Sequence, residues 1–290
     1  MNSPLLTIAT VCYNAVKVIN PTIESVLSQT CMEYEYVFID GKSDDGTTDV
    51  ISSRNVDFER LGITYHLISE KDHGIYNAMN KAVALAKGEW IIFMNAGDRF
   101  YGPQVLEWLK PYCLESNHDV IYGDTVFWRD GLYKYEDASS RTGAMPFCHQ
   151  SCVTRRSILQ KYSFNEQYRI CADYDFYVRL QKSGALYFYI HKPISIFAAN
   201  GLSSNNYLKL LQEHNAIDLR YGLITSKNAE SIIQAYYAQR KSTPPRTNKE
   251  KLKKFIRNMI PRKWILWRQQ RQKHQRMMQE GWTQNIPDIP

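Results

Sequence analysis

Two acidic residues directly follow short apolar runs, which makes both of them candidates for ligand binding. The stretch "WIIFMNAGD" at 90–98 turns from large apolar residues to a polar step that ends at Asp98, and "VFIDG" breaks in the same way at Asp40. Short apolar runs with β-branched and aromatic residues are typical of strands buried on both faces of a parallel sheet. Because open parallel sheets bind ligands beyond the carboxyl ends of their strands, Asp98 is a site candidate. The alternative for Asp98 is a solvated turn residue.

Asp40 stands where a carboxylate can accept hydrogen bonds from a nucleotide base or sugar. The acidic and hydroxyl residues that follow it, Asp44, Asp45 and Thr47, have the spacing of a helix cap, and both interpretations can hold because they concern different groups. The phosphate-binding sequences G-x-G-x-x-G and G-x-x-x-x-G-K-[ST] are absent. A bound diphosphate would therefore need another source of positive charge. A divalent cation, Mn²⁺ or Mg²⁺, held by Asp98 is the candidate, since hard cations bind carboxylate oxygens and keep positions for substrate phosphates.

Alternating strands and helices must position these residues in the first part of the chain. Apolar runs predict strands at 5–11, 36–39, 63–68 and 90–94. A helix is expected from Asn20-Pro21 to about Gln29, and another over about 75–87, ended by Gly88. This alternation indicates an α/β protein with βαβ units and a parallel sheet.

The pattern changes after about residue 105, where loop-rich segments separate the predicted elements. These are helices at 104–115, 173–183 and 206–221 and strands at 119–127 and 186–190. In the helix at 173–183, Asp173 and Asp175 would point about 200° apart, so only one of them can face a given site. The "CHQSC" cluster at 148–152 offers no second pair of metal ligands, which favours a structural or substrate-binding use over zinc.

The positive charge is concentrated near the carboxyl end. Residues 240–280 contain 14 Lys and Arg against two Glu, a local charge of +12, whereas the whole chain of 290 residues carries +7, which leaves −5 for the rest. No run of 18 apolar residues occurs, so no membrane-spanning helix is expected. The absence of a basic, apolar leader and the scattered placement of six cysteines favour a cytoplasmic protein with reduced thiols.

Taken in order, the motifs resemble a known family. The segments "TIATVCYNAV", "EYVFIDGKSDDGTTDVI" and "ISEKDHGIYNAMNKAVALAKGEWIIFMNAGD" are similar to the N-terminal half of family 2 glycosyltransferases, which have the GT-A fold. The later pieces "YGD", "CHQS", "ADYDFYVRLQKSG" and "NGLSSNN" resemble a bacterial subgroup that builds exopolysaccharides, such as colanic acid, and O-antigens. The resemblance covers about 5–206. It implies a nucleotide-sugar-binding half at 1–105, an acceptor-binding half at 106–222 and a tail at 223–290.

The resemblance implies roles in donor binding for five residues. Val11 and Tyr13 would border the nucleotide base, Asp40 would bind that base, and Asp72 in "EKDHG" would lie near the nucleoside and diphosphate. Asp98 matches the last acid of the family's metal-binding motif. The first acid of that motif is replaced by Asn95, which can offer only a carbonyl oxygen, so we expect modest metal affinity that depends on bound donor.

The resemblance also implies the catalytic base and the acceptor contacts. Asp173 matches the acid that takes a proton from the acceptor hydroxyl during an inverting attack, and Asp175 is the rival. His149 and Gln150 would lie on the acceptor side, although His149 could equally be a histidine satisfied within the fold. Asp124 in "YGD" would touch the acceptor.

The basic tail predicts a membrane contact. In 251–268, apolar residues recur at helical spacing with Lys and Arg on the opposite face, which is typical of an amphipathic helix on an anionic bilayer; the alternative is a helix packed on its own globule. Thr243-Pro244-Pro245-Arg246 would be a hinge before it. With a lipid-linked glycan acceptor, the enzyme would be peripheral on the inner face of the bacterial cytoplasmic membrane. The other function classes are a nucleic-acid-binding protein, disfavoured by the acidic globule, and an inactive sugar-nucleotide-binding partner of another transferase.

Overall fold

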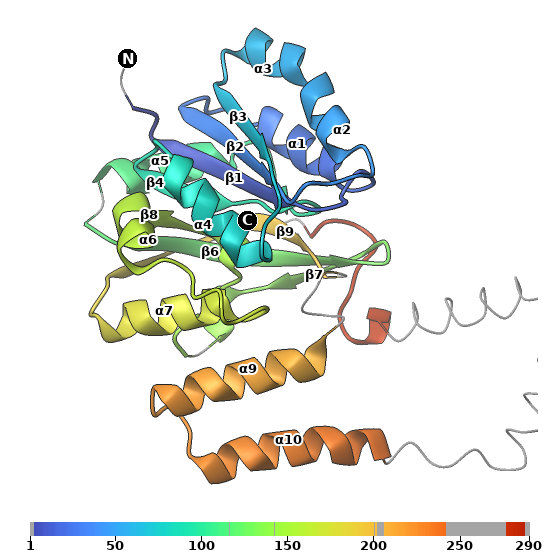
Figure 1. Ribbon diagram of the computed structural model, residues 1–290, viewed down its shortest axis with the longest axis vertical. Coiled ribbons are helices and arrows are strands. Elements are labelled where there is room, and N and C mark those ends of the chain that lie inside the picture. Colours follow the sequence, from blue (N-terminus) through green and yellow to red (C-terminus); the bar gives the residue numbers. More distant parts are fainter. Residues whose placement is uncertain are drawn as a thin grey trace, which may run out of the picture.

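A computed structural model describes residues 3–115, 117–141, 143–199, 201, 206–241 and 277–287 (Figure 1). Within these residues, one nine-stranded sheet has the order β3-β2-β1-β4-β8-β6-β9-β5, and β7 pairs with β6 outside this path. The strands are β1 (Leu6–Cys12), β2 (Tyr34–Asp40), β3 (Tyr65–Ser69), β4 (Trp90–Phe93), β5 (Arg99–Phe100), β6 (Val120–Arg129), β7 (Leu132–Glu136), β8 (Cys152–Arg155) and β9 (Tyr187–Ala198).

The first part of the sheet is parallel, as the apolar runs predict. Strands β3, β2, β1 and β4 lie side by side in parallel register, and every residue of β1, β2 and β4 is buried. Their carboxyl ends therefore meet at one edge. The end of β2 is Asp40, and β4 is followed at once by the turn that contains Asp98.

The second part of the sheet is mixed. Strand β8 is antiparallel to both β4 and β6, β9 is parallel to β6, and β5 is antiparallel to β9. Neither β7 nor β8 is among the predicted strands, and β9 continues well past the predicted end at 190. The antiparallel pairing through β8 places the segment before it, 147–151, against the turn that follows β4.

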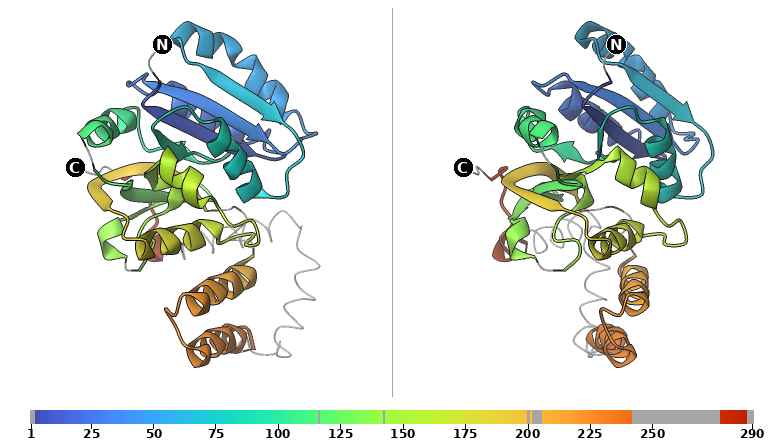
Figure 2. Two further views of the ribbon diagram at one scale, coloured as in Figure 1. Left: turned by 60° about the vertical axis from the view of Figure 1, so that its left-hand side comes forward. Right: turned by 90° about the vertical axis from the view of Figure 1, so that its left-hand side faces the viewer.

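Helices cover both faces of the sheet (Figures 1 and 2). One buried cluster contains apolar side chains from α1 (Ile19–Leu27), α2 (Thr47–Ser53), α3 (Asn55–Leu61) and α5 (Val105–Glu115). The other cluster contains side chains from α4 (Ile75–Leu85), α6 (Arg156–Tyr162) and α7 (Ala172–Lys182). The helices predicted at 20–29, 75–87, 104–115 and 173–183 correspond to α1, α4, α5 and α7, whereas α3 and α6 have no predicted counterpart.

Gly88 does not end the preceding helix, which is the role expected for it. Helix α4 ends at Leu85, and Gly88 does not have the left-handed backbone of a helix-ending glycine. Instead it packs against β1, where an added Cβ would lie 2.5 Å from the carbonyl carbon of Leu6. The prediction that Gly88 ends the helix is wrong, because the glycine serves close approach between two backbones.

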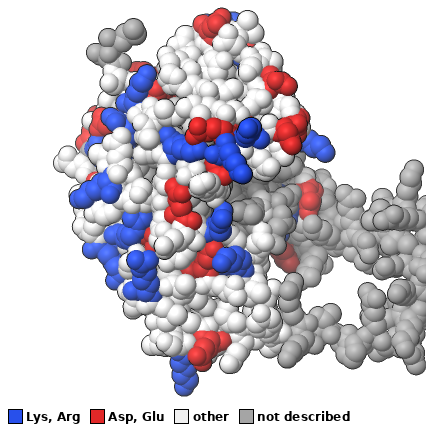
Figure 3. Space-filling view, viewed as in Figure 1, with Lys and Arg blue, Asp and Glu red and all other residues white. Residues whose placement is uncertain are grey.

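The carboxyl-terminal part divides in two. Helices α9 (Tyr207–Arg220) and α10 (Ser226–Lys241) pack on each other beside α7 (Figure 1), whereas 277–287 lies beside β7. The expected hinge at 243–246 and the expected amphipathic helix at 251–268 lie outside the described residues. In the part of the chain that the structure describes, no helix is both long and apolar enough to cross a bilayer. Acidic and basic side chains both occur across the face drawn in Figure 3.

Candidate active site

Three segments that are far apart in the sequence meet at the carboxyl end of β4. They are the turn Asn95–Asp98, the 3₁₀ turn η2 (His149–Ser151) and the first turn of α7. Two consecutive residues of η2 hold the two ends of the Asn95–Asp98 turn: His149 Nε2 lies 3.2 Å from Asn95 Nδ2, and Gln150 Nε2 donates to Asp98 Oδ2 at 2.9 Å. The other ring nitrogen of His149 lies 2.9 Å from Asp173 Oδ2. The predicted residues Asp98, His149, Gln150 and Asp173 therefore form one connected cluster.

Asp98 is a buried carboxylate rather than a solvated turn residue. Only 4% of it is exposed, and its Oδ1 accepts a hydrogen bond of 2.8 Å from the backbone amide of Ala198 at the end of β9. Burial raises the pKa of Asp98 to about 6, although the Ala198 amide, His149 and Gln150 act in the opposite direction. An ionised carboxylate kept in this position is poised to attract a cation.

The neighbouring amide of Asn95 offers a second oxygen. Its Nδ2 points to His149 Nε2, and its Oδ1 is buried without a hydrogen-bond partner. A buried polar atom without a partner is rare, and this oxygen is available to coordinate a cation. Together with Asp98, this oxygen fits the preference of Mn²⁺ and Mg²⁺ for oxygen ligands. Among the described residues, no group of three His, Cys, Asp or Glu side chains is placed to hold a metal.

Asp173 lies at the start of α7 with both carboxylate oxygens hydrogen-bonded. Oδ2 faces His149, and Oδ1 lies 2.8 Å from the hydroxyl of Tyr76 in α4 and accepts a bond from the amide of Tyr174. Burial by itself would raise the pKa of Asp173, but the hydrogen bonds from His149 and Tyr76 outweigh it and hold the pKa below its usual range. Asp173 is therefore ionised at neutral pH, as a general base must be.

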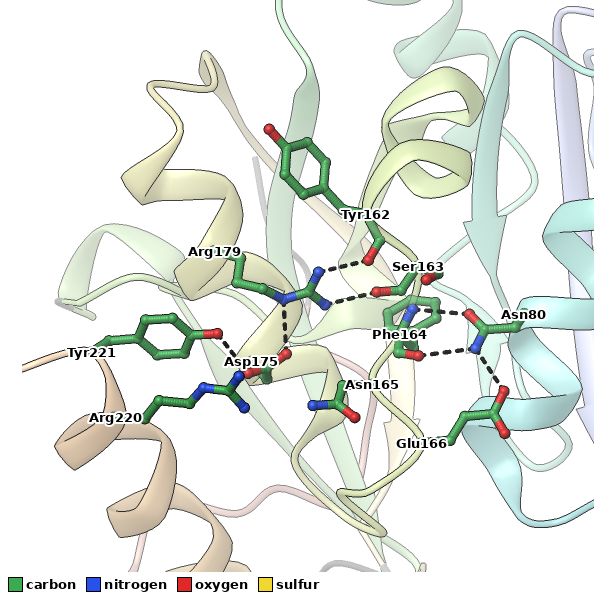
Figure 4. Close-up of a pocket in the computed structure, with 10 residues that line it drawn as sticks. All are labelled: Asn80, Tyr162, Ser163, Phe164, Asn165, Glu166, Asp175, Arg179, Arg220 and Tyr221. Atoms are coloured by element: carbon green, nitrogen blue, oxygen red, sulfur yellow. Dashed lines mark hydrogen bonds and ion pairs between the residues drawn. The ribbon is translucent and has the colours of Figure 1, made fainter.

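Asp175 points to the opposite side of α7. Its Oδ2 accepts a 2.8 Å hydrogen bond from Arg179 Nε, and its Oδ1 lies 3.1 Å from the hydroxyl of Tyr221 at the end of α9 (Figure 4). Arg179 also donates to the carbonyl oxygens of Tyr162 and Ser163. These groups line a polar pocket of about 490 Å³ behind α7, in which Asp175 and Arg179 pair with protein groups. The expected divergence of Asp173 and Asp175 is thus present, and Asp173 is the one that faces the cluster.

The predicted nucleotide-binding residues gather at the neighbouring ends of β1 and β2. Tyr13 follows β1 and is 66% exposed, so its ring is available for contact with a base. Gly41 lies between it and Asp72: a Cβ on Gly41 would come within 2.6 Å of Asp72 Oδ2 and 3.3 Å of the Tyr13 ring. Glycine thus leaves room for these two side chains beside the loop, and a larger residue would displace the Asp72 carboxylate. Val11 is buried in β1 just before them.

Asp40 is fully buried, and its contacts organise the loop that it begins. Its carboxylate accepts hydrogen bonds from the amide and hydroxyl of Ser43 and from the hydroxyl of Ser69, the last residue of the neighbouring strand β3. The helix cap expected from Asp44, Asp45 and Thr47 is not formed as predicted, because the N-cap of α2 is Gly46 and no side chain caps the helix. Asp45, one residue before it, accepts hydrogen bonds from the amide and hydroxyl of Thr47. Contact between Asp40 and a nucleotide base stays a prediction.

Asp124 is not brought together with the other site residues. Its carboxylate accepts hydrogen bonds from the hydroxyls of Tyr135 and Tyr189 and from the amide of Ala138, and only 1% of the residue is exposed. Its carbonyl oxygen accepts a 2.9 Å bond from the hydroxyl of Ser151. Asp124 thus binds η2 through the Ser151 hydroxyl. Its contact with an acceptor stays a prediction.

Two groups of the site have no place among the predicted residues. Tyr76 could have been suspected, because it stands in "DHGIYN" between two candidate segments, but the helical apolar spacing selects Ile75 and Met79 instead. The Ala198 amide could not have been suspected, since a backbone donor carries no signal in the sequence. Both groups hold a carboxylate that the sequence does identify.

Comparison with known proteins supports this reading of the motifs. The sequence matches the family model described as Glycosyl transferase family 2 over residues 7–187. A curated relative, the PGL/p-HBAD biosynthesis glycosyltransferase of Mycobacterium bovis, is 28% identical over 244 residues, which cover 80% of this chain and 94% of the relative.

Two solved structures are similar to the described fold. The mannosyltransferase PcManGT from Pyrobaculum calidifontis, solved in complex with GDP-Man and Mn²⁺, matches with a TM-score of 0.61 at 14% identity, over 92% of this chain and 83% of that chain. S. aureus TarS in complex with UDP matches with a TM-score of 0.58 at 16% identity, over 86% and 75% of the two chains. At these identities the likeness concerns the fold, and the predicted α/β architecture of the GT-A type is confirmed.

Proposed function

The chain belongs to glycosyl transferase family 2, and from this premise we propose that it is an inverting enzyme that transfers a sugar from a nucleotide-diphosphate sugar to a glycan acceptor. The observation that carries the proposal is the double bridge made by η2. Through His149 and Gln150, it links the carboxylate proposed as the base to the one proposed for the donor side. An enzyme that must bring a sugar acceptor to a bound diphosphate needs both groups in one site.

In the proposed reaction, Asp173 acts on the acceptor hydroxyl. The hydroxyl oxygen forms a bond to the anomeric carbon as the bond from that carbon to the diphosphate oxygen breaks, and the hydroxyl proton passes to the Asp173 carboxylate. The diphosphate leaves with the electron pair of the broken bond, on the face opposite the attack, so the anomeric configuration inverts. Tyr76 and His149 keep the carboxylate ionised and oriented before the hydroxyl arrives.

The donor would lie along the carboxyl ends of β1, β2 and β4. Tyr13 offers an exposed ring to the base, and Asp72 offers a carboxylate to the nucleoside. Asp98 and Asn95 Oδ1 would hold Mn²⁺ or Mg²⁺, which supplies positive charge to the departing diphosphate. The similar mannosyltransferase was solved with GDP-Man and Mn²⁺, which supports this assignment.

The acceptor is proposed to be a lipid-linked glycan of a bacterial cell-surface polysaccharide. The support is the charge of 240–280, which contains 14 Lys and Arg and only two Glu, because such a segment favours an anionic lipid surface. The protein would then work as a cytoplasmic, peripheral enzyme on the inner face of the cytoplasmic membrane. His149 and Gln150 would contact the acceptor from η2.

A ligand panel tests the proposed function. UDP-sugars and GDP-sugars are added singly to the full chain, with Mn²⁺, with Mg²⁺ or with a chelator, and the melting temperature is measured beside donor hydrolysis. We expect one nucleotide class to stabilise the wild type only when the ion is present, by about 2.7 kcal/mol at 100 times its Kd. Asp98→Ala should lose this ion-dependent shift. A panel in which no nucleotide sugar shifts the melting temperature and none is hydrolysed would refute the proposed function.

A further inference from the structure

The segment 277–287 is fixed at two points to parts of the domain that lie more than a hundred residues before it in the sequence. Thr283 and Tyr133 exchange backbone hydrogen bonds of 2.7 and 2.6 Å, which adds a bridge to the edge of β7. The hydroxyl of Tyr101 donates to the carbonyl oxygen of Pro287 at 2.7 Å. Figure 1 draws this segment in red beside β7. We call it the C-terminal clasp.

The clasp buries two large side chains against the end of β9. Met277 and Trp282 are 5% and 8% exposed and form a separate apolar cluster with Leu132 and Ala199. Arg129 contacts this cluster, since its guanidinium lies over the Trp282 ring at 5.7 Å from the ring centre. This cluster is small and lies apart from the two main cores.

Ala199, a member of this cluster, directly follows Ala198, whose amide binds the Asp98 carboxylate. Arg129 Nε donates to the carbonyl oxygen of Ala199 at 3.1 Å, and the amide of Ala199 donates to the carbonyl oxygen of Trp128 at 2.9 Å. The preceding amide, that of Ala198, is the one that donates to Asp98 Oδ1. The backbone that the clasp covers is therefore the backbone that orients the Asp98 carboxylate.

We propose that the C-terminal clasp is a positioning element of the donor site: Met277 and Trp282 hold the end of β9 so that the Ala198 amide stays on Asp98. The proposal rests on the proposed function of Asp98 in donor binding. The clasp lies outside residues 7–187, which the family model matches. Without it, Ala199 loses its apolar cover, and the amide that fixes Asp98 becomes free to move.

The test uses a matched pair of neighbouring methionines in the full chain. Met277 is buried in the cluster, whereas Met278 is 43% exposed and serves as the control. Met277→Ala, Met278→Ala and the volume-conserving Met277→Leu are compared with the wild type. Two quantities are measured: the hydrogen-exchange rate of the Ala198 amide, and the affinity for UDP and GDP in the presence of Mn²⁺. The melting temperature is recorded to establish that the main cores remain folded.

We expect Met277→Ala to speed exchange at Ala198 and to weaken nucleotide binding by about 10- to 100-fold, the range for a lost hydrogen bond to a charged group. Met277→Leu and Met278→Ala should resemble the wild type in both quantities. Faster exchange with unchanged nucleotide affinity would overturn the proposal, because the clasp would then serve only the local fold. Unchanged exchange would overturn it as well. A wild type that binds neither nucleotide would refute the proposed function, and this proposal with it.

Discussion

Replacing Tyr76 by phenylalanine should weaken both the fold and the proposed base. The change removes the hydroxyl that lies 2.8 Å from Asp173 Oδ1 and 2.7 Å from the carbonyl oxygen of Ile170. The ring stays, so its packing 5.7 Å from the Phe164 ring is kept and no cavity forms. A hydrogen bond to a charged group contributes about 1.5–3 kcal/mol, which sets the expected loss in the free energy of unfolding at neutral pH.

The pH dependence of this loss has a definite sign. Because the pKa of Asp173 in the folded state lies below the ordinary value of 3.8, its ionised form stabilises the fold above that pH, and the stabilisation is lost as pH falls through the folded-state pKa. The difference between wild type and Tyr76→Phe should therefore be full at pH 7 and narrow below about pH 4. Urea unfolding at several pH values measures it.

The catalytic effect of Tyr76→Phe should be separate from its effect on stability. With one of its hydrogen bonds gone, Asp173 can rotate away from the acceptor hydroxyl, and we expect kcat to fall by about 10- to 100-fold while donor KM stays within a factor of about two. Tyr177→Phe is the control, because Tyr177 is a buried tyrosine of the same core whose hydroxyl contacts Cys152 and Thr154 instead. If both variants lose stability and neither loses kcat, Tyr76 does not position the base.

Two further outcomes are expected. Burial raises the pKa of Asp98 to about 6, so the folded state holds the proton of this carboxyl more tightly than the unfolded state does. As pH rises from about 4 to 6, the free energy of unfolding of the metal-free wild type should therefore fall by about 3 kcal/mol relative to that of Asp98→Asn. A difference between the two proteins in urea unfolding that does not change with pH would contradict this environment for Asp98. The full chain should sediment with vesicles that contain anionic lipid and not with neutral ones, and high salt should release it. Replacing Phe255 and Trp264 by serine should weaken that binding even at low salt, whereas equal binding to neutral vesicles would refute the membrane contact.

The sequence predicts the parallel part of the sheet well because its strands are buried on both faces. The run 90–94 is apolar at every position, and a chain of this kind has few alternatives to a central strand. The polar step to Asp98 then identifies the end of the strand. The divergence of Asp173 and Asp175 follows from helical geometry alone, and the structure has it.

The sequence cannot predict which distant groups complete the site. The contact of Gln150 with Asp98 joins residues more than fifty positions apart, and it depends on the short strand β8, whose four residues carry too little pattern to be recognised. The Ala198 amide has no side-chain signature at all. The clasp could not be predicted either. The charge of 240–280 indicates an exposed tail, whereas Met277 and Trp282 are buried against the domain.

The most direct test of the proposed mechanism compares the two acids of α7 in one transfer assay. Asp173→Asn keeps the size of the side chain but removes the base, and we expect kcat to fall by about 10²- to 10⁴-fold with nearly unchanged donor affinity. Asp175→Asn disturbs the contacts with Arg179 and Tyr221 on the far side of α7, so it should lower the melting temperature and have a much smaller effect on kcat. If Asp175→Asn abolishes transfer in a folded protein while Asp173→Asn remains active, the base has been assigned to the wrong residue, and the site described around His149 and Asp98 is not where the chemistry occurs.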